Sequence, residues 1–423
     1  MIITNISDEF LDDLYDEDFE VETSYRNDVF GGMSIKDVIA NLQKRKDNIS
    51  GGGINCIPFP FDTLRKYLPG VEQEQLVIVT ASTKIGKTQI TSYLYLYTVL
   101  EYCFTHPQQC SCHIIYVPLE ESVARITERY MSHLLWQLDG MRVSPAQLRS
   151  TSTEDPAPQE ALDLLQTKPY KDRLEFFEKC VEFDTEDFNP TGIRNKCVAY
   201  AKEVGTVKTH TVKANSDGSD IEVFDEYIPN DPNHFKILFI DHLSLIDNEK
   251  GMSLKQSMDK LTEYCVKYLR NRYKYTCIIV QQQAFEQEGL EAIKQKNIMP
   301  TLAGLSDSKY SSRDSNVVLG LFSPHKFGLE TWLGYDIRRL GNYARFLKIL
   351  AARDYEGDVS FGLFFDGATC DFTELPKPED ITELDKTYAK AEELRKRNKS
   401  KPKEQEHKEP QQQKLILTTI VLL

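Results

Sequence analysis

Short runs of apolar residues alternate along this chain with longer segments in which apolar residues recur every three or four positions. The runs predicted to be strands are Leu76–Thr80, His113–Pro118, Leu174–Phe176, Lys236–Ile240, Cys277–Val280, Val317–Leu321 and Phe346–Ala351. A last hairpin is expected from Gly362–Phe365 and Cys370–Phe372. Buried strands that alternate with amphipathic helices predict an α/β fold, with a mostly parallel central sheet and helices on both faces.

Changes in composition divide the chain into three parts. Residues 1–55 form an acidic extension with a helical pattern at 34–46, which the glycines 51–53 end. Residues 56–376 form the α/β region, with a polar insertion at about 206–232 that resembles a hairpin. Residues 377–423 begin as a charged helical stretch and continue as a low-complexity tail, which we expect to be disordered.

The strand Leu76–Thr80 leads into the clearest chemical pattern of the chain. Beyond the strand and a loop, apolar residues recur at helical spacing through Leu100. The loop and first helical residues are Ala81, Ser82, Thr83, Lys84, Ile85, Gly86, Lys87 and Thr88. A strand, a loop ending in Gly-Lys-Thr and a helix bind nucleotide phosphates, because loop N–H groups and the helix N-terminus cradle the β-phosphate. Lys87 would reach the β- and γ-phosphates, and the Thr88 hydroxyl would hold Mg²⁺.

This phosphate loop, Ala81–Thr88, departs from the usual pattern at its first position. The generic motif begins with Gly six residues before the Lys, where this chain has Ala81. Gly-Lys-Thr alone is also common by chance, so its place at a strand-to-helix turn is what makes it informative. The alternative is an ordinary connection that binds no ligand.

Two other predicted strands end in acidic residues. Asp241 follows Lys236–Ile240, where open α/β sheets bind ligands, and would stand behind the Mg²⁺. Glu120 follows His113–Pro118 and would polarise the attacking water, provided that its strand neighbours the phosphate-loop strand. The alternatives are that Asp241 caps a turn and that Glu120 supplies charge to a helix N-terminus.

A third strand, Cys277–Val280, runs into Gln281, Gln282 and Gln283. Amide groups at a strand end can detect a γ-phosphate and transmit its loss to the next loop. Here that loop, Ala284–Ser306, is long and polar, as a DNA-contacting loop would be. Because polar residues are common at strand ends, the alternative is a glutamine run without a function.

The composition indicates the cellular compartment of the protein, but it does not identify the ligand. The net charge is −14, from 51 basic and 65 acidic residues, which argues against a surface that is basic overall. It does not exclude a nucleic-acid partner, because a ring can line its channel with Lys and Arg. Nine scattered cysteines and the absence of a signal-peptide pattern predict reduced thiols in the cytoplasm. The apolar end Leu415–Leu423 is too short to span a membrane.

Taken together and in this order, the strand ends resemble the ATPase domain of DnaB-type replicative helicases, in the RecA-like superfamily, over about residues 56–375. The family's loop often has Ala where the generic motif has Gly, as at Ala81. IIYVPLEES is similar to the strand that carries the family's catalytic base, which implies that role for Glu120. FKILFIDHLSLI is similar to its Walker B strand, which implies that Asp241 associates with Mg²⁺. CIIVQQQ is similar to the strand of its sensor glutamine, which implies Gln282.

The resemblance continues through FLKILAARDYEGDVSFGLFFDGATCDF, where the family has an arginine finger that completes the neighbouring subunit's site. Arg353 matches that finger; the alternative is a surface arginine at a strand end. The family usually has a Lys two residues earlier, where this chain has Ala351. Arg345 and Lys348 are the candidates to replace that Lys; otherwise hydrolysis is slower.

The resemblance implies a homo-hexamer that binds ATP and Mg²⁺ between subunits and moves on single-stranded DNA, with a primase or a helicase loader as further partners. About 55 residues precede the core, too few for the family's N-terminal primase-binding domain. Reduced versions of this kind are familiar among bacteriophage replication proteins, which act in the bacterial host cytoplasm. The helix at 34–46 would then pack on the next subunit of the ring.

Two other functions stay open on the sequence. The first is a DNA-dependent ATPase that does not unwind, such as a recombinase-like filament or a helicase accessory factor, which the short N-terminus and Ala351 favour. The second is a P-loop kinase for a small metabolite, which the glutamine run and the segment around Arg353 disfavour.

Overall fold

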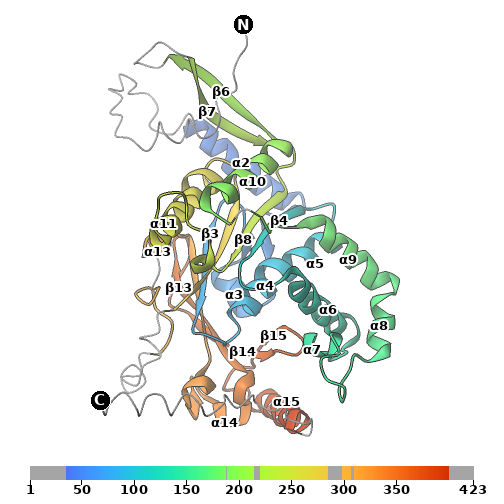
Figure 1. Cartoon of the computed structure of the whole chain (residues 1–423). Coiled ribbons are helices and arrows are strands. Elements are labelled where there is room, and N and C mark those ends of the chain that lie inside the picture. Colours follow the sequence, from blue (N-terminus) through green and yellow to red (C-terminus); the bar gives the residue numbers. More distant parts are fainter. Residues whose placement is uncertain (1–34, 187, 214–219, 284–297, 306–308, 400–423) are drawn as a thin grey trace, which may run out of the picture. The chain divides into compact units, whose positions relative to one another are not determined.

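A nine-stranded sheet forms the centre of the computed structural model, which describes residues 35–186, 188–213, 220–283, 298–305 and 309–399 (Figure 1). Its strands in spatial order are β15 (Asp371–Glu374), β14 (Ser360–Asp366), β13 (Ala344–Ala352), β10 (Val317–Phe322), β3 (Leu76–Ala81), β9 (Thr276–Gln282), β8 (His234–Asp241), β4 (Ser111–Pro118) and β5 (Val181–Phe183). The strands from β10 to β5 are parallel, and β13, β14 and β15 extend one edge antiparallel. The expected α/β fold with a mostly parallel sheet is therefore confirmed.

One predicted strand is wrong. Leu174–Phe176 lies inside helix α9 (Lys168–Cys180), and the strand at this edge of the sheet is β5, which follows the helix. The buried residues of α9 are Tyr170, Phe177 and Cys180, whose spacing is helical. A short apolar run cannot be assigned to strand or helix by its pattern alone, which explains the error.

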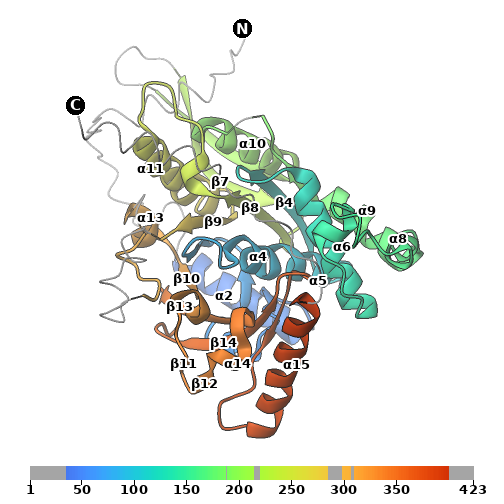
Figure 2. The same cartoon turned by 60° about the horizontal axis from the view of Figure 1, so that its bottom comes forward.

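Helices cover both faces of the sheet. Figure 2 shows α4 (Lys87–Ser92) and α5 (Thr98–Thr105) on one side of the strands, and α10 (Pro190–Glu203) and α11 (Leu254–Tyr264) on the other. The remaining helical segments of this body are α3 (Asp62–Tyr67), α6 (Val123–Asp139), α7 (Pro145–Leu148), α8 (Gln159–Leu165), η2 (Leu243–Leu245), η3 (Cys265–Arg270), α13 (Lys309–Asp314), η5 (Pro324–Phe327), α14 (Ile337–Leu340), η6 (Gly341–Tyr343) and α15 (Ile381–Lys399). Every residue of β3 is buried, as expected for a strand with helices on both faces.

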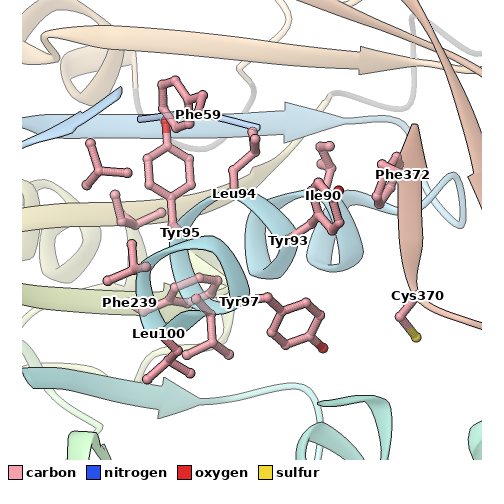
Figure 3. Packing of buried hydrophobic residues seen from close by; sticks show 14 of the residues in the cluster. Phe59, Ile90, Tyr93, Leu94, Tyr95, Tyr97, Leu100, Phe239, Cys370 and Phe372 are labelled. Carbon is pink, nitrogen blue, oxygen red and sulfur yellow. The ribbon is translucent and has the colours of Figure 1, made fainter. Parts of the chain in front are cut away.

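The helix after the phosphate loop is buried on all sides at its middle turn. It runs from α4 through a π-helical turn, η1 (Tyr93–Tyr97), into α5, and all five residues of η1 are buried. Figure 3 shows Tyr95 beside Phe59 and Tyr93 beside Phe372, with ring centroids 5.6 and 5.5 Å apart. A helix buried all round is held by packing rather than by one amphipathic face. This packing fixes the helix that begins at Lys87.

A second apolar cluster joins the antiparallel edge to the C-terminal helix. Leu384, Tyr388, Ala391 and Leu394 of α15 are buried in it together with residues of β13, β14 and α14. The expected charged helical stretch is therefore a helix, and one side of it is buried. Two small antiparallel sheets, β1 (Cys56–Pro58) with β2 (Gly70–Glu72) and β11 (Thr331–Trp332) with β12 (Tyr335–Asp336), complete this body.

Contacts divide the chain into two units, with residues 54–206 and 227–423 in the larger. In the smaller unit, α2 (Ile35–Ser50) is the helix expected near 34–46. Its Ile35, Val38, Ile39 and Leu42 lie at helical spacing and are 39–62% exposed. Strands β6 (Gly205–Lys213) and β7 (Asp220–Pro229) form the hairpin expected in the polar insertion.

Of the helices in the described ranges, none combines the length and apolar character needed to cross a bilayer. The apolar end Leu415–Leu423 and the low-complexity tail before it lie outside the described residues.

Candidate functional site

The phosphate loop lies at the carboxyl end of β3, and a glycine in an unusual conformation starts its helix. Gly86 caps α4 with φ 101°, in the left-handed region. A Cβ on Gly86 would also come within 3.3 Å of the Phe365 ring. The positive φ favours glycine at this position, immediately before Lys87, and the close ring leaves little room for a larger residue.

Asp241 ends β8 next to the start of this helix and is 3% exposed. The Thr88 hydroxyl donates to Asp241 Oδ1 over 3.3 Å, and the Tyr116 hydroxyl donates to Asp241 Oδ2 over 3.3 Å. Burial raises the pKa of Asp241 to about 6, against the opposing charge of Lys87. Asp241 is therefore ionised at neutral pH but is held there at a cost in free energy.

Thr88 and Asp241 together offer oxygen atoms suited to Mg²⁺. That ion takes one or two protein oxygens and completes its shell with water and substrate phosphates. In the described part of the chain, no group of three or more His, Cys, Asp or Glu side chains could hold a metal.

Glu120 reaches this site by a different route from the one we expected. We expected the strand before Glu120 to neighbour the phosphate-loop strand. This is wrong, because β9 and β8 lie between β4 and β3. β4 pairs with β8 instead, in a register that sets Pro118 opposite Asp241. Glu120 is half exposed there, with Oε2 3.8 Å from His242 Nε2. It also raises the pKa of Asp241, so the two carboxylates are close enough to interact.

The neighbouring acid is engaged elsewhere. Glu121 forms a two-pronged ion pair with Arg129 of α6. Of the two adjacent glutamates, Glu120 is the one that lies toward Asp241.

Gln282, at the end of β9, contacts the phosphate loop itself. Its side-chain amide donates to the Thr83 hydroxyl over 3.0 Å. Gln283 is buried and donates to Thr80 Oγ1 and to the carbonyl of Thr301, so it joins β3 and the end of β9 to the last part of the next loop. Most of that loop, with Lys294 and Lys296, lies outside the described residues.

Arg353 lies at the other end of the sheet from the phosphate loop. It follows β13 and donates to the carbonyls of Ser315 and Arg313, next to the start of β10. There Asn316 bonds to Leu76, the first residue of β3, whereas the loop follows Ala81. Five residues of strand separate these ends by roughly 17 Å. Arg353 therefore cannot reach the loop of its own chain.

The two replacements considered for the missing Lys near Ala351 have other contacts. Lys348 forms an ion pair with Asp358, 2.6 Å apart. Arg345 is buried and donates to the carbonyl of Ile85 in its own phosphate loop. A buried side chain cannot reach a neighbouring molecule, so Arg345 is wrong as a substitute for that Lys.

Two cations that hold the loop were missed from the sequence. Lys326 donates to the carbonyl of Thr83 over 3.0 Å, and Arg345 donates to that of Ile85 over 2.5 Å. Lys326 follows β10, the strand beside β3, so the carboxyl end of Val317–Leu321 was the signal that could have found it. No signal in the sequence pointed to the contact between Arg345 and Ile85, because this contact depends on how the antiparallel strand β13 packs beside β10.

A cavity of about 600 Å³ lies close to the phosphate loop, within the size range of ligand sites. Phe365 belongs to its wall and also packs against Gly86. Other lining residues are Tyr343, Asn342, Arg142 and Asp366. An aromatic wall with polar groups, beside a phosphate loop, can accept the base and sugar of a nucleotide.

No protein-family model matches the chain, and no curated protein matches its sequence. Among solved structures, one described as an ATPase domain is similar over 81% of this chain and 99% of its own, with a TM-score of 0.54 and 14% identity. A DnaB-like replicative helicase, described with its interactions with primase, is similar over 81% of this chain and 67% of its own, with the same TM-score and identity.

The chain therefore has a RecA-like α/β fold. This fold is similar to that of the ATPase domain of a DnaB-like replicative helicase, as the resemblance in sequence implied.

Proposed function

We propose that this chain is an ATP-driven replicative DNA helicase that translocates on single-stranded DNA and unwinds the duplex at the fork. The observation that carries the proposal is that the phosphate loop, Asp241, Glu120 and Gln282 lie together at the carboxyl ends of the parallel strands. Phosphoryl transfer from ATP needs this combination of a phosphate cradle, a metal-associated acid and a group that orients water.

Each residue has a proposed role in hydrolysis. Lys87 contacts the β- and γ-phosphates, and Thr88 and Asp241 hold Mg²⁺, which neutralises charge on the phosphates when bound. Glu120 takes the proton of the attacking water; its half-exposed carboxylate beside Asp241 supports this role. Gln282 detects the γ-phosphate, which its hydrogen bond to Thr83 supports.

We further propose that the active assembly is a ring, a hexamer by analogy with the resembled family. Arg353 would act as the finger of the neighbouring subunit's site, since it lies far from its own loop. The exposed apolar residues of α2 would pack on the next subunit. One structural neighbour is described as interacting with primase, and a primase or a helicase loader is the proposed partner here.

Single-stranded DNA would follow the loops after Asp241 and Gln283, with basic side chains on its phosphates. Each neutralised phosphate releases a counterion, so we expect affinity for DNA to fall steeply as salt rises.

The decisive test is the rate of ATP hydrolysis with and without single-stranded DNA, together with the native mass. We expect DNA to stimulate the wild-type rate and Lys87→Ala to lower kcat/KM on the order of a hundredfold, the effect of removing one donor from a developing oxyanion. Lys171→Ala, an exposed lysine of α9, is the matched control and should keep the wild-type rate. A monomer that DNA does not stimulate, or full activity in Lys87→Ala, would contradict the proposal.

The second candidate is a DNA-dependent ATPase that does not unwind, and Ala351 favours it, because the family's usual Lys is absent. Fork-substrate unwinding separates the two candidates: DNA-stimulated hydrolysis without strand separation would support the second.

A further inference from the structure

Arg345 is a buried cation whose hydrogen bonds all go to neutral oxygen atoms. The side chain is 2% exposed. Its Nε donates to the carbonyl of Ile85 over 2.5 Å, and its Nη1 donates to Ser323 Oγ and to the carbonyls of Asn342 and Ala344 over 2.7–3.2 Å. Its Nη2 donates to Asn342 Oδ1 over 3.3 Å. Across the described ranges, no carboxylate forms an ion pair with this guanidinium.

Two partly buried arginines near the site have carboxylate partners. Arg142 pairs with Asp366, and Arg129 pairs with Glu121. A buried charge is costly unless an opposite charge compensates it, and burial accordingly lowers the pKa of Arg345 to about 10. Among the described residues, Arg345 is thus a buried charge beside the phosphate loop without a carboxylate partner, and an anion bound by the loop could compensate it.

The bond to Ile85 also fixes the direction of one phosphate-loop peptide. In a planar trans peptide the C=O and the next N–H point to opposite sides. With the Ile85 carbonyl held by Arg345, the N–H of Gly86 must point away from Arg345. Phe365 supports the same peptide, because its ring lies under the Arg345 guanidinium, 5.2 Å from Cζ, and against Gly86.

We propose that Arg345 is a positioning residue for the nucleotide phosphates: it directs the Gly86 N–H toward them, and they supply the counter-charge that no carboxylate among the described residues provides. This inference rests on the proposed function only as far as ATP binding. A carbonyl that accepts from a cation also makes its peptide N–H a stronger donor, which favours a bound anion.

Nucleotide affinity tests this proposal. It is measured by titration with fluorescent ATP and ADP analogues, and steady-state kinetics show whether KM or kcat changes. Arg345→Gln should weaken ATP and ADP alike by about tenfold or more, the effect of losing one charged hydrogen bond. Both nucleotides carry the β-phosphate that the loop holds, so their ratio should not change. Arg345→Lys returns the charge without the planar fork and should recover part of the affinity.

Arg194→Gln is the matched control. Arg194 is 3% exposed on α10, and its guanidinium lies over the Tyr264 ring at 4.8 Å. This variant removes an equally buried guanidinium from α10, on the side of the sheet opposite α4. It should keep the wild-type affinity for both nucleotides. An equal loss of affinity in Arg194→Gln would overturn the inference, because the effect would then reflect general destabilisation.

Wild-type affinity in a folded Arg345→Gln variant would also overturn it. Where melting shows that Arg345→Gln does not fold, Arg345→Lys carries the test, and unchanged affinity in that variant overturns the inference. A wild-type chain that binds neither nucleotide overturns both this inference and the proposed function. One that binds both and responds to Arg345→Gln, yet never unwinds DNA, overturns the helicase proposal alone.

Discussion

At the scale of single residues, the site keeps charged side chains out of water. Asp241 and Arg345 are 3% and 2% exposed. Burial raises the pKa of Asp241 and lowers the pKa of Arg345, which favours the neutral form of each group. A nucleotide with its Mg²⁺, bound as proposed, would bring the opposite charge to both groups. Burial of these charges lowers the stability of the ligand-free protein.

Asp241→Asn tests this relation. The pKa of Asp241 is raised from 3.8 to about 6 in the folded state, so the folded protein binds more protons than the unfolded chain between these values. Stability therefore falls as pH rises from about 4 to 6, by about 3 kcal/mol in total. Asp241→Asn should raise the free energy of unfolding by up to about 3 kcal/mol at pH 8 and by little at pH 4, while ATP hydrolysis is lost.

Urea denaturation of both proteins at the two pH values measures the difference. Asp371, whose pKa is also raised to about 6, titrates in both proteins and cancels in the comparison. A variant that is less stable than the wild type at pH 8 would show that the hydrogen bonds of Asp241 outweigh its burial.

At the scale of elements, the hairpin of β14 and β15 connects α6 with the phosphate loop. Asp371 of β15 accepts from Trp136 and Gln137 of α6, and Asp366 at the end of β14 accepts two bonds from Arg142 just beyond that helix. Phe365 of the same hairpin packs against Gly86. The loop therefore has a support whose own position depends on two buried carboxylates.

Arg142→Met should destabilise this support strongly. The Arg142 and Asp366 side chains are 13% and 12% exposed, so the substitution leaves Asp366 buried without its partner. We expect the free energy of unfolding to fall by about 3 kcal/mol. Adding Asp366→Asn should restore part of the loss, because it removes the uncompensated charge, and urea denaturation of the single and double variants measures both effects. A double variant less stable than Arg142→Met would argue against a charge effect.

At the scale of the whole molecule, the distance between Arg353 and its own phosphate loop requires a second chain if this arginine is to complete a site. Arg353 and the loop lie at opposite ends of β3 and β10, so a head-to-tail contact between chains would bring them together.

Mixing two inactive variants tests this arrangement. Lys87→Ala lacks the loop lysine and Arg353→Ala lacks the finger, and each alone should hydrolyse ATP at least about a hundredfold more slowly than the wild type. In mixed assemblies, some interfaces combine an intact loop with an intact finger, so the mixture should recover a measurable part of the DNA-stimulated rate. A mixture that forms joint assemblies but stays inactive would exclude a role for Arg353 between chains.

Much of the fold and the loop could be predicted from local sequence. Apolar runs and helical spacing identify most strands, because a strand buried on both faces must be apolar throughout. Lys87, Thr88 and Asp241 could be proposed from the sequence, because the chemistry proposed for them depends on a strand and the residues directly after it. The run Leu174–Phe176 marks the limit, since three apolar residues fit a strand or one side of a helix equally well.

The order of strands and the partners of single side chains came only from the tertiary structure. The sheet places β8, not β3, beside β4 and so brings Glu120 to Asp241. It also turns Arg345 inward to the Ile85 carbonyl, where the sequence suggested an outward replacement for a missing Lys. The physical reason is common to both: the periodicity of a chain says which residues are buried, whereas the contacts of a buried group depend on elements far away in sequence.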